Sequence, residues 1–292
     1  MCRLFGMSAG AQRASASFWL LEAPDSLSAQ SRREPDGTGL GTYDEHDRPH
    51  VDKRPIAAYA DRAFAEEARD RRSRTFIAHI RFASTGGLEL RNTHPFEQAG
   101  RLFAHNGVIG DLDRLDRELA EQRSLVGGDT DSERFFALIT KEAEAAGGDL
   151  AQGIARAVRW IAAELPVFAL NFVLVTADEL WAFRYPDTHE LFVLERSAGG
   201  PTGGRHLEHA SAAGSIRVRS GDLADQPAVV VASERMDEDP DWRPIESGTL
   251  LRVGPDLRVA ATVVLEQPPR HPLTLADLGP TAAASQRPSA PA

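Results

Sequence analysis

The stretch Met1-Cys2-Arg3-Leu4-Phe5-Gly6 opens the chain and holds its only cysteine among 292 residues. Leu4 and Phe5 predict a short strand over Cys2–Ser8, in which Gly6 permits close backbone contact. Removal of Met1 would give Cys2 both a thiol, which is a nucleophile as thiolate, and an α-amine, which accepts a proton near neutral pH. The alternative is a small buried apolar side chain, the commoner role of a lone cysteine. The rest of the chain decides between the two.

The composition is that of a globular domain, with 42% hydrophobic and 26% charged residues. The formal net charge of −10 argues against binding to nucleic acid or to anionic membranes. No stretch approaches the roughly 18 apolar residues of a membrane span. The first residues lack the basic and long apolar regions of a signal peptide. We therefore expect a cytoplasmic protein with a reduced thiol.

The single cysteine excludes an internal disulfide and any site with several thiolate ligands. His46 and His50 lie four residues apart in an expected loop, and no third ligand is evident, which argues against a metal site. A run of four arginines over residues 69–74 is broken by Asp70 and is typical of a solvated helix end. The sequence thus predicts no metal and no basic binding patch.

Helices are expected in the first 165 residues and strands mostly in the remainder. The expected helices are 14–21, 25–33, 61–71, 111–122 (capped by Asp111), 131–145 (capped by Asp131 or Ser132) and 150–164. The expected strands are 39–43, 51–54, 75–81, 102–106, 169–176, 180–183, 190–195, 216–218, 228–232, 249–253 and 259–265. From about Pro268 the chain is rich in Pro, Ala, Thr and Ser, so we expect one domain over residues 2–267 and a disordered tail over 268–292.

Four further segments carry side chains suited to chemistry. They are Arg81-Phe82-Ala83-Ser84-Thr85-Gly86-Gly87, Asn92-Thr93-His94-Pro95-Phe96, His105-Asn106-Gly107 and Gly128-Asp129-Thr130-Asp131-Ser132-Glu133. Each alone is a weak signal, because Asn-Gly is usually a turn and an Asp before a helix is usually a cap. Their order along the chain, behind an N-terminal Cys2, is specific.

Taken together, these segments resemble the class II glutamine amidotransferases of the N-terminal-nucleophile (Ntn) hydrolase superfamily. The resemblance covers most of residues 2–265 and is greatest to stand-alone members, which begin Met-Cys-Arg and carry a Pro-Asp-Gly loop like Pro35–Gly37. It implies an α+β fold, a four-layer αββα sandwich of two antiparallel sheets covered by helices. Many strands with helices in two clusters are consistent with that fold.

The resemblance also implies a role for each matching residue. Cys2 matches the nucleophile that Met1 removal exposes. Arg81 matches the arginine that grips the α-carboxylate of glutamine, for which a planar guanidinium is suited; a surface salt bridge is its alternative. Asp131 matches the acid that binds the α-ammonium group, although it could also be a helix cap. Asp129 competes for this role, but Asp131-Ser132-Glu133 fits the family's Asp-Thr-Glu better.

Asn106 and Gly107 match the family's oxyanion hole, with a side-chain NH₂ and a backbone N–H as donors. Many members have Thr-His where this chain has Ser84-Thr85. Ser84 is assigned to the substrate carboxylate, and the missing His leaves its local contacts open. His94 is expected to support a loop rather than to catalyse, because the N-terminal amine already supplies the base.

The implied reaction is hydrolysis of the side-chain amide of glutamine, or of a related γ-glutamyl amide, through a γ-glutamyl thioester on Cys2. It needs no metal or organic cofactor. One alternative keeps the mechanism and takes a γ-glutamyl conjugate of a thiol pathway of the ergothioneine type. Another is a non-catalytic subunit that senses glutamine or holds a partner. Either a synthetase on another chain accepts the ammonia, or the amide is simply hydrolysed.

Overall fold

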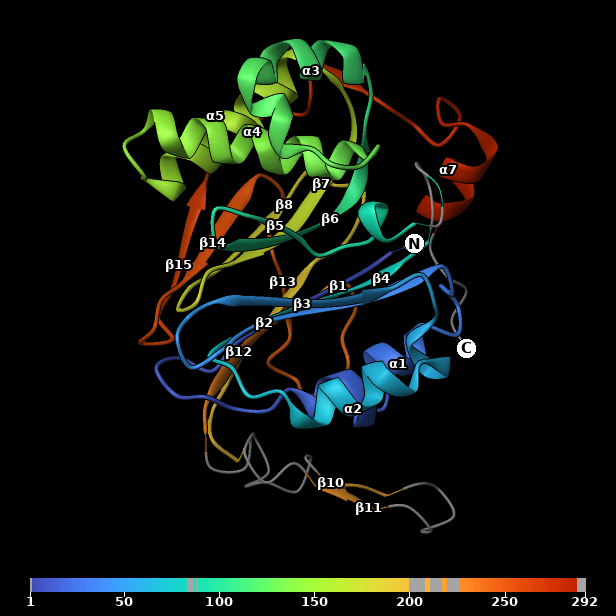
Figure 1. Cartoon of the computed structure of the whole chain (residues 1–292), viewed down its shortest axis with the longest axis vertical. Coiled ribbons are helices and arrows are strands. Elements are labelled where there is room, and N and C mark those ends of the chain that lie inside the picture. The colour runs from blue at the N-terminus through green and yellow to red at the C-terminus, as the bar shows by residue number, and fades with distance from the viewer. Residues whose placement is uncertain are drawn as a thin grey trace.

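Two antiparallel sheets lie face to face in the computed structural model, which describes residues 2–82, 87, 89–199, 208–210, 217–219 and 226–287 (Figure 1). The first sheet contains, in spatial order, β13 (Arg243–Pro244), β9 (Phe192–Arg196), β12 (Ala228–Ala232), β1 (Arg3–Ser8), β4 (Thr75–Arg81), β2 (Gly37–Tyr43) and β3 (Pro49–Arg54). The second contains β15 (Val259–Val263), β14 (Thr249–Val253), β8 (Leu180–Arg184), β7 (Pro166–Val175), β6 (Arg101–Ile109) and β5 (Phe96–Gln98). A separate pair is formed by β10 (Glu208–Ala210) and β11 (Arg217–Arg219).

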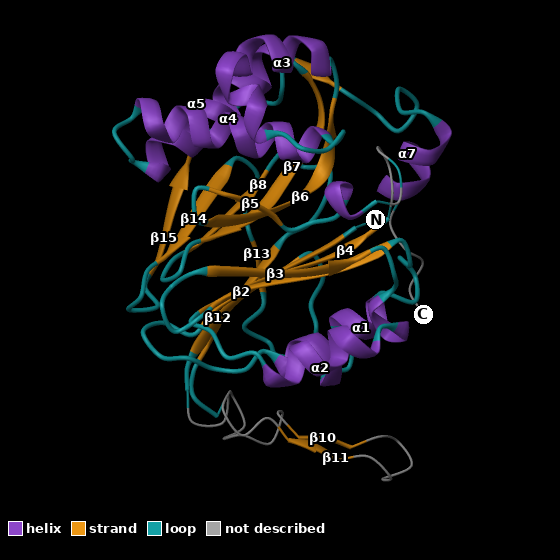
Figure 2. Cartoon of the chain, in the orientation of Figure 1, coloured by secondary structure: helices purple, strands orange, loops and turns teal. Residues whose placement is uncertain are grey.

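Helices cover the outer face of each sheet (Figure 2). The second sheet carries α3 (Leu112–Leu119), α4 (Asp131–Ala145) and α5 (Leu150–Glu164), and the first carries α1 (Leu27–Gln30) and α2 (Arg62–Asp70). Single turns occur at η1 (Phe18–Glu22), η2 (Ala58–Ala60), η3 (Leu90–Asn92) and η4 (Ala120–Leu125). The predicted four-layer αββα sandwich is therefore confirmed. No helix in the described part of the chain combines the length and the apolarity needed to cross a bilayer.

Three apolar layers hold the sandwich together. The middle layer joins the facing sheets through side chains such as Leu4, Ile77 and Val173. Both faces of the central strands are covered, so β7 is apolar except for Asn171, and all but its first residue are buried. Burial on both faces also explains why β1 is buried along its whole length. Its first residue follows Cys2 directly.

Helix starts follow capping chemistry with one difference from the prediction. Asp111 accepts a hydrogen bond from the backbone N–H of Arg114 at 3.2 Å, which confirms it as the cap of α3. The cap of α4 is Thr130, which accepts from the N–H of Glu133 at 3.2 Å, and not Asp131 or Ser132. Asp131 is the first helical residue instead, so its carboxylate is available for other contacts.

The segment after Pro268 differs from the expected disordered tail. Its residues are described as far as Arg287. β16 (His271–Pro272) pairs in parallel with β7, and α7 (Pro280–Gln286) follows. Leu273 and Leu278 pack on a small cluster of Val108, Phe168 and Ala169. Two apolar anchors and a proline at the start of the helix explain how a Pro/Ala-rich segment packs on the sandwich. Ordered chain therefore continues beyond the predicted boundary at residue 267.

Candidate functional site

A small cavity of about 20 Å³ lies beside Cys2. The residues that line it are Cys2, His79, Arg81, Phe82, Asn92, His94, His105, Gly107, Thr130, Asp131, Ser132 and Gln286. They come from β4, β6, the first turn of α4, the last residue of α7 and the loops between these elements. Four of the residues predicted from sequence, Cys2, Arg81, Gly107 and Asp131, therefore share one cavity although up to 129 positions separate them.

The Cys2 thiol lies against the backbone of Phe82. Its Sγ accepts a hydrogen bond from the Phe82 N–H at 3.2 Å and lies 3.3 Å from the Phe82 carbonyl oxygen. Burial raises the pKa of the Cys2 thiol, while the backbone contact with Phe82 acts in the opposite direction. Because burial prevails, little thiolate exists at neutral pH without a base.

The residues after Cys2 fix the start of β1. The Arg3 guanidinium is fully buried and pairs with Glu234 at 2.7 Å and with Glu34 at 3.8 Å. Leu4 and Ser233 exchange two hydrogen bonds, at 3.0 and 3.1 Å. A buried cation that is paired and hydrogen-bonded is strongly held. The backbone that carries Cys2 thus has a defined position at the edge of the cavity.

Asn106 joins the second sheet to this position. Its side-chain Nδ2 donates to the Cys2 carbonyl oxygen at 3.1 Å, and the residue is 1% exposed. Its Oδ1 is buried and has no hydrogen-bond partner among the described residues. A carboxamide carries two N–H donors, so the hydrogen bond to Cys2 leaves a second N–H. Asn106 itself is not among the described residues that line the cavity.

Gly107 lies on β6 where the next strand leaves no room for a side chain. A Cβ there would lie 1.9 Å from the Ala169 carbonyl oxygen and 2.7 Å from His105 Nε2. Only glycine fits without moving β6 away from β7. The close approach of the two strands therefore determines the residue type at this position, beside Asn106.

Asp131 links α4 to β6. Its Oδ2 accepts from the Ile109 N–H at 2.9 Å, and its Oδ1 accepts from the Ser132 N–H at 2.9 Å. The side chain is 3% exposed and borders the cavity. An ionised carboxylate offers about four acceptor positions, so two backbone contacts leave capacity for a cation. Asp129, the competing candidate, does not line this cavity and bonds to Asn92 instead.

Arg81 ends β4 and borders the same cavity. Its Nη1 donates to the Gly87 carbonyl oxygen at 2.9 Å, and the residue is 3% exposed. Burial lowers the pKa of Arg81, and nearby Cys2 and Asp36 oppose that shift. Ser84, the other predicted substrate-binding residue, lies outside the described residues.

Three buried histidines at the cavity were not predicted to lie together. His79 and His94 have ring centroids 4.2 Å apart, and their ring nitrogens have no partner among the described residues. His105 contacts the Ser132 hydroxyl at 2.9 Å and the Ala169 carbonyl oxygen at 3.2 Å. Burial lowers the pKa of all three, that of His79 to about 3, so the rings are neutral at pH 7. The alternation of the strand at residues 75–81, which puts His79 and Arg81 on one face, could have indicated the first of them.

Gln286 was also missed, because the sequence suggested a disordered tail there. It is 1% exposed, and its Oε1 lies 2.8 Å from Nε2 of His189. Nothing in the local sequence relates residue 286 to Cys2, since only the packing of the tail on β7 brings them to one cavity.

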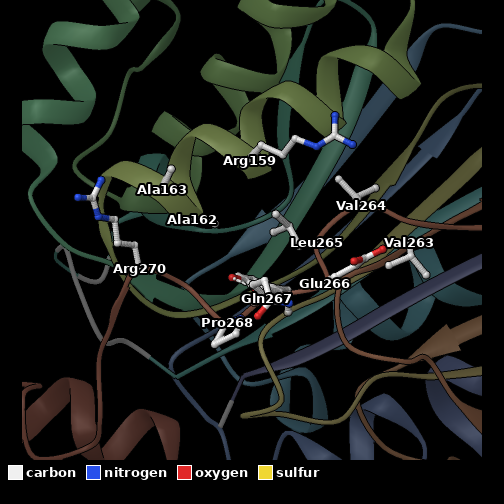
Figure 3. Close-up of a pocket in the computed structure, with 11 residues that line it drawn as sticks. Arg159, Ala162, Ala163, Val263, Val264, Leu265, Glu266, Gln267, Pro268 and Arg270 are labelled. Atoms are coloured by element: carbon white, nitrogen blue, oxygen red, sulfur yellow. Dashed lines mark hydrogen bonds between the residues drawn. The ribbon is translucent and has the colours of Figure 1, made fainter.

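A second hollow, of about 550 Å³, lies between α5 and residues 263–270 (Figure 3). Arg159 and Arg270 border it, and no cysteine or histidine is among the described residues that line it. No cluster of three or more His, Cys, Asp or Glu in the described ranges is arranged to hold a metal ion.

Comparison with known proteins places this geometry in context. The family described as "Glutamine amidotransferases class-II" matches residues 1–273. The chain is 28% identical to the gamma-glutamyl-hercynylcysteine sulfoxide hydrolase of Mycobacterium tuberculosis, over 87% of this chain and 93% of that protein. It is also 28% identical to an uncharacterized protein of Methanocaldococcus jannaschii, over 78% of this chain and 63% of that protein. Two other curated relatives are matched over only 14% and 26% of their own length.

Solved structures agree on the fold. The glutamine phosphoribosylpyrophosphate amidotransferase of B. subtilis superposes with a TM-score of 0.62 at 19% identity, over 91% of this chain and 50% of that chain. At this identity the likeness establishes the shared sandwich alone.

We expect Gly107→Ala to lower the free energy of unfolding by about 1–3 kcal/mol, because the added methyl group forces β6 from β7. Denaturant unfolding of the purified variant measures this. Gly127→Ala is the matched control, since the nearest atom to its Cβ, Oε1 of Glu133, is 3.8 Å away; we expect a change within about 0.5 kcal/mol. Equal stability of the two variants would contradict the steric role of Gly107.

Proposed function

The chain belongs to the class II glutamine amidotransferases, and on that premise we propose that it hydrolyses the side-chain amide of glutamine or a related γ-glutamyl amide. The observation that carries the proposal is the single cavity lined by Cys2, Arg81, Gly107 and Asp131. These residues supply a nucleophile for the amide carbon, a cation for the α-carboxylate, a backbone donor for the oxyanion and an anion for the α-ammonium group.

Substrate recognition follows from the two opposite charges. The α-carboxylate of a γ-glutamyl group would pair with the Arg81 guanidinium, and its α-ammonium with the Asp131 carboxylate. Both side chains are at most 3% exposed, so these ion pairs would form away from bulk water, where they are stronger. The backbone contacts of Asp131 hold its carboxylate in place for this role. Ser84 is proposed to assist at the carboxylate.

Transition-state stabilisation is assigned to Asn106 and Gly107. Attack on the amide carbon places negative charge on oxygen, which the second N–H of Asn106 and the backbone N–H of Gly107 would receive. Asn106 is already oriented by its hydrogen bond to Cys2. Donors held in place before the reaction need no reorganisation as the charge develops.

The proposed cycle has two halves, formation of a thioester on Cys2 and its hydrolysis. Removal of Met1 exposes the Cys2 α-amine, which takes the thiol proton, and the thiolate attacks the amide carbon. The resulting ammonium group returns the proton to the leaving nitrogen, and the C–N bond breaks. Ammonia departs, and a γ-glutamyl thioester remains on Cys2. Water then attacks that thioester, its proton passing to the amine and on to the departing thiolate. A base this close is needed because burial raises the pKa of the thiol.

The substrate class has two candidates. Glutamine is one, with ammonia released or passed to a synthetase on another chain. A γ-glutamyl conjugate is the other, and it is favoured by the match to the mycobacterial hydrolase over 93% of that protein's length.

A non-catalytic sensing role is the alternative from another class, and absence of turnover by material with a free N-terminal Cys2 would support it. A cytoplasmic location belongs to the proposal, because the mechanism uses a reduced thiol.

Active protein should begin at Cys2, because the mechanism requires its free amine. Intact mass and N-terminal sequencing of the active fraction measure this. Cys2→Ala should abolish hydrolysis with the fold unchanged, and Cys2→Ser should lower kcat by at least about a thousandfold, because a serine hydroxyl is far harder to deprotonate. Full activity in material that retains Met1 would contradict the proposed mechanism.

Arg81→Lys should raise KM at least about tenfold although the charge is kept, because one ammonium cannot reproduce a two-point grip on a carboxylate. Asp131→Asn should raise KM more for γ-glutamyl amides with a free α-amine than for their N-acetyl forms. Steady-state kinetics on both substrates provide the measurement. The assignment of Asp131 fails if both substrates lose equally, since the residue would then act only through Ile109 and α4.

Asn106→Ala should lower kcat about a hundredfold or more with little change in KM, because the donor acts mainly on the charged transition state. Glutamine binding to a Cys2→Ala, Asn106→Ala double variant, measured by calorimetry, should match that of Cys2→Ala alone. Loss of binding in the double variant would instead assign Asn106 a structural role, through its contact with the Cys2 backbone.

A further inference from the structure

Gln286 separates two hollows. It lines the cavity at Cys2, and it also lines an outer hollow of about 390 Å³. The other described residues of the outer hollow are Phe168, Thr188, His189, Leu273, Thr274 and Leu275. One side chain thus forms the partition between the proposed catalytic cavity and a much larger hollow.

Within the described residues, two hydrogen bonds hold the Gln286 side chain. Gln286 Oε1 lies 2.8 Å from His189 Nε2, and its Nε2 donates to the Ser285 hydroxyl at 3.3 Å. Only Ala283, Ser285 and Gln286 of α7 are buried, and α7 lies apart from the helical layers, beside the N-terminal end of β1 (Figure 1). Short elements with few buried contacts open at low free energy.

The cavity at Cys2 is too small for the proposed substrate in the chain that retains Met1. Its volume of about 20 Å³ is close to what a single water molecule needs. A γ-glutamyl group has nine non-hydrogen atoms and does not fit a space of that size, which either removal of Met1 or displacement of a lining side chain would enlarge. Displacing Gln286 would join the cavity to the outer hollow and give access to Cys2.

We propose that Gln286 is a gate between the catalytic cavity and the outer hollow, and that this hollow is the subsite for the amine portion of a γ-glutamyl amide. The inference rests on the proposed function. Phe168, Leu273 and Leu275 give the hollow an apolar lining, and the His189 ring packs 5.3 Å from that of Phe168. The lining favours an apolar or aromatic leaving group over ammonia.

The gate has a measurable consequence. If the site is open for only a fraction of the time, its apparent affinity for a ligand is its intrinsic affinity multiplied by that fraction. Gln286→Ala removes both the blocking side chain and its hydrogen bond to His189. Losing one such bond corresponds to about a fivefold shift toward the open state. His189→Phe keeps a ring in place but removes the same hydrogen bond, so it should act in the same direction.

Alkylation of Cys2 by iodoacetamide, followed by intact mass, tests the gate without any substrate. Gln286→Ala should raise the rate at least about fivefold over the parent chain, and His189→Phe should raise it also. Thr281→Ala, an exposed position on the same helix, should match the parent, and equal melting temperatures would show that folding is intact. Unchanged rates in both gate variants would overturn the gate, even if the parent hydrolyses glutamine.

Two substrates test the subsite: L-glutamine and γ-glutamyl-p-nitroanilide, compared by kcat/KM. Gln286→Ala should raise kcat/KM for both. Leu275→Trp, which fills the outer hollow, should lower the anilide-to-glutamine ratio at least fivefold, and an unchanged ratio would overturn the subsite. If the parent hydrolyses neither compound while Gln286→Ala still exposes Cys2 to alkylation, the proposed function fails and the gate stands.

Discussion

A hydrogen bond between the two sheets is the contact on which the site depends. Asn106 on β6 donates to the Cys2 carbonyl oxygen at 3.1 Å and so fixes the start of β1, in the first sheet, against the strand next to the β5 edge of the second. The paired, fully buried guanidinium of Arg3 also donates to the Cys2 carbonyl oxygen, at 3.5 Å. Because an apolar layer joins the sheets along the rest of their faces, this polar end has a fixed geometry. In the proposed mechanism one amide therefore both positions the nucleophile and faces the developing charge.

The surroundings of the cavity explain why one residue would have to supply both nucleophile and base. Burial raises the pKa of the Cys2 thiol and lowers that of the three neighbouring histidines. A neutral ring with a pKa of about 3, as at His79, is a poor base at neutral pH. An α-amine on Cys2 has an ordinary pKa of about 7.7–8.0. It belongs to the same residue as the thiol from which it takes the proton. The low polarity that weakens the histidines as bases would strengthen the contacts of Arg81 and Asp131 with a charged substrate.

Local patterns predicted much of the fold and less of the site. The strands at 75–81, 228–232 and 249–253 and the helix at 150–164 agree with the structure because each is specified by its own periodicity. The cap of α4 was misplaced by one residue, because Thr130 and Asp131 are both good caps and only the contact of Asp131 with Ile109 selects between them. Gln286 was unpredictable, since its place follows from the packing of Leu273 and Leu278 on a distant strand. The matching motifs made Cys2, Arg81 and Asp131 candidates, but their shared cavity is a property of the tertiary structure.

In the proposed mechanism Cys2 is an N-terminal nucleophile within a site that recognises a γ-glutamyl group. The most direct test is intact mass after incubation with 6-diazo-5-oxo-L-norleucine, a glutamine analogue whose diazoketone alkylates a reactive thiol. Cys2 is the only cysteine, so the adduct has one thiol to modify. The proposed mechanism predicts a chain that lacks Met1 and carries one adduct, which excess glutamine blocks and which forms more slowly in Arg81→Lys at limiting reagent. A chain that lacks Met1, remains folded and stays unmodified would contradict it.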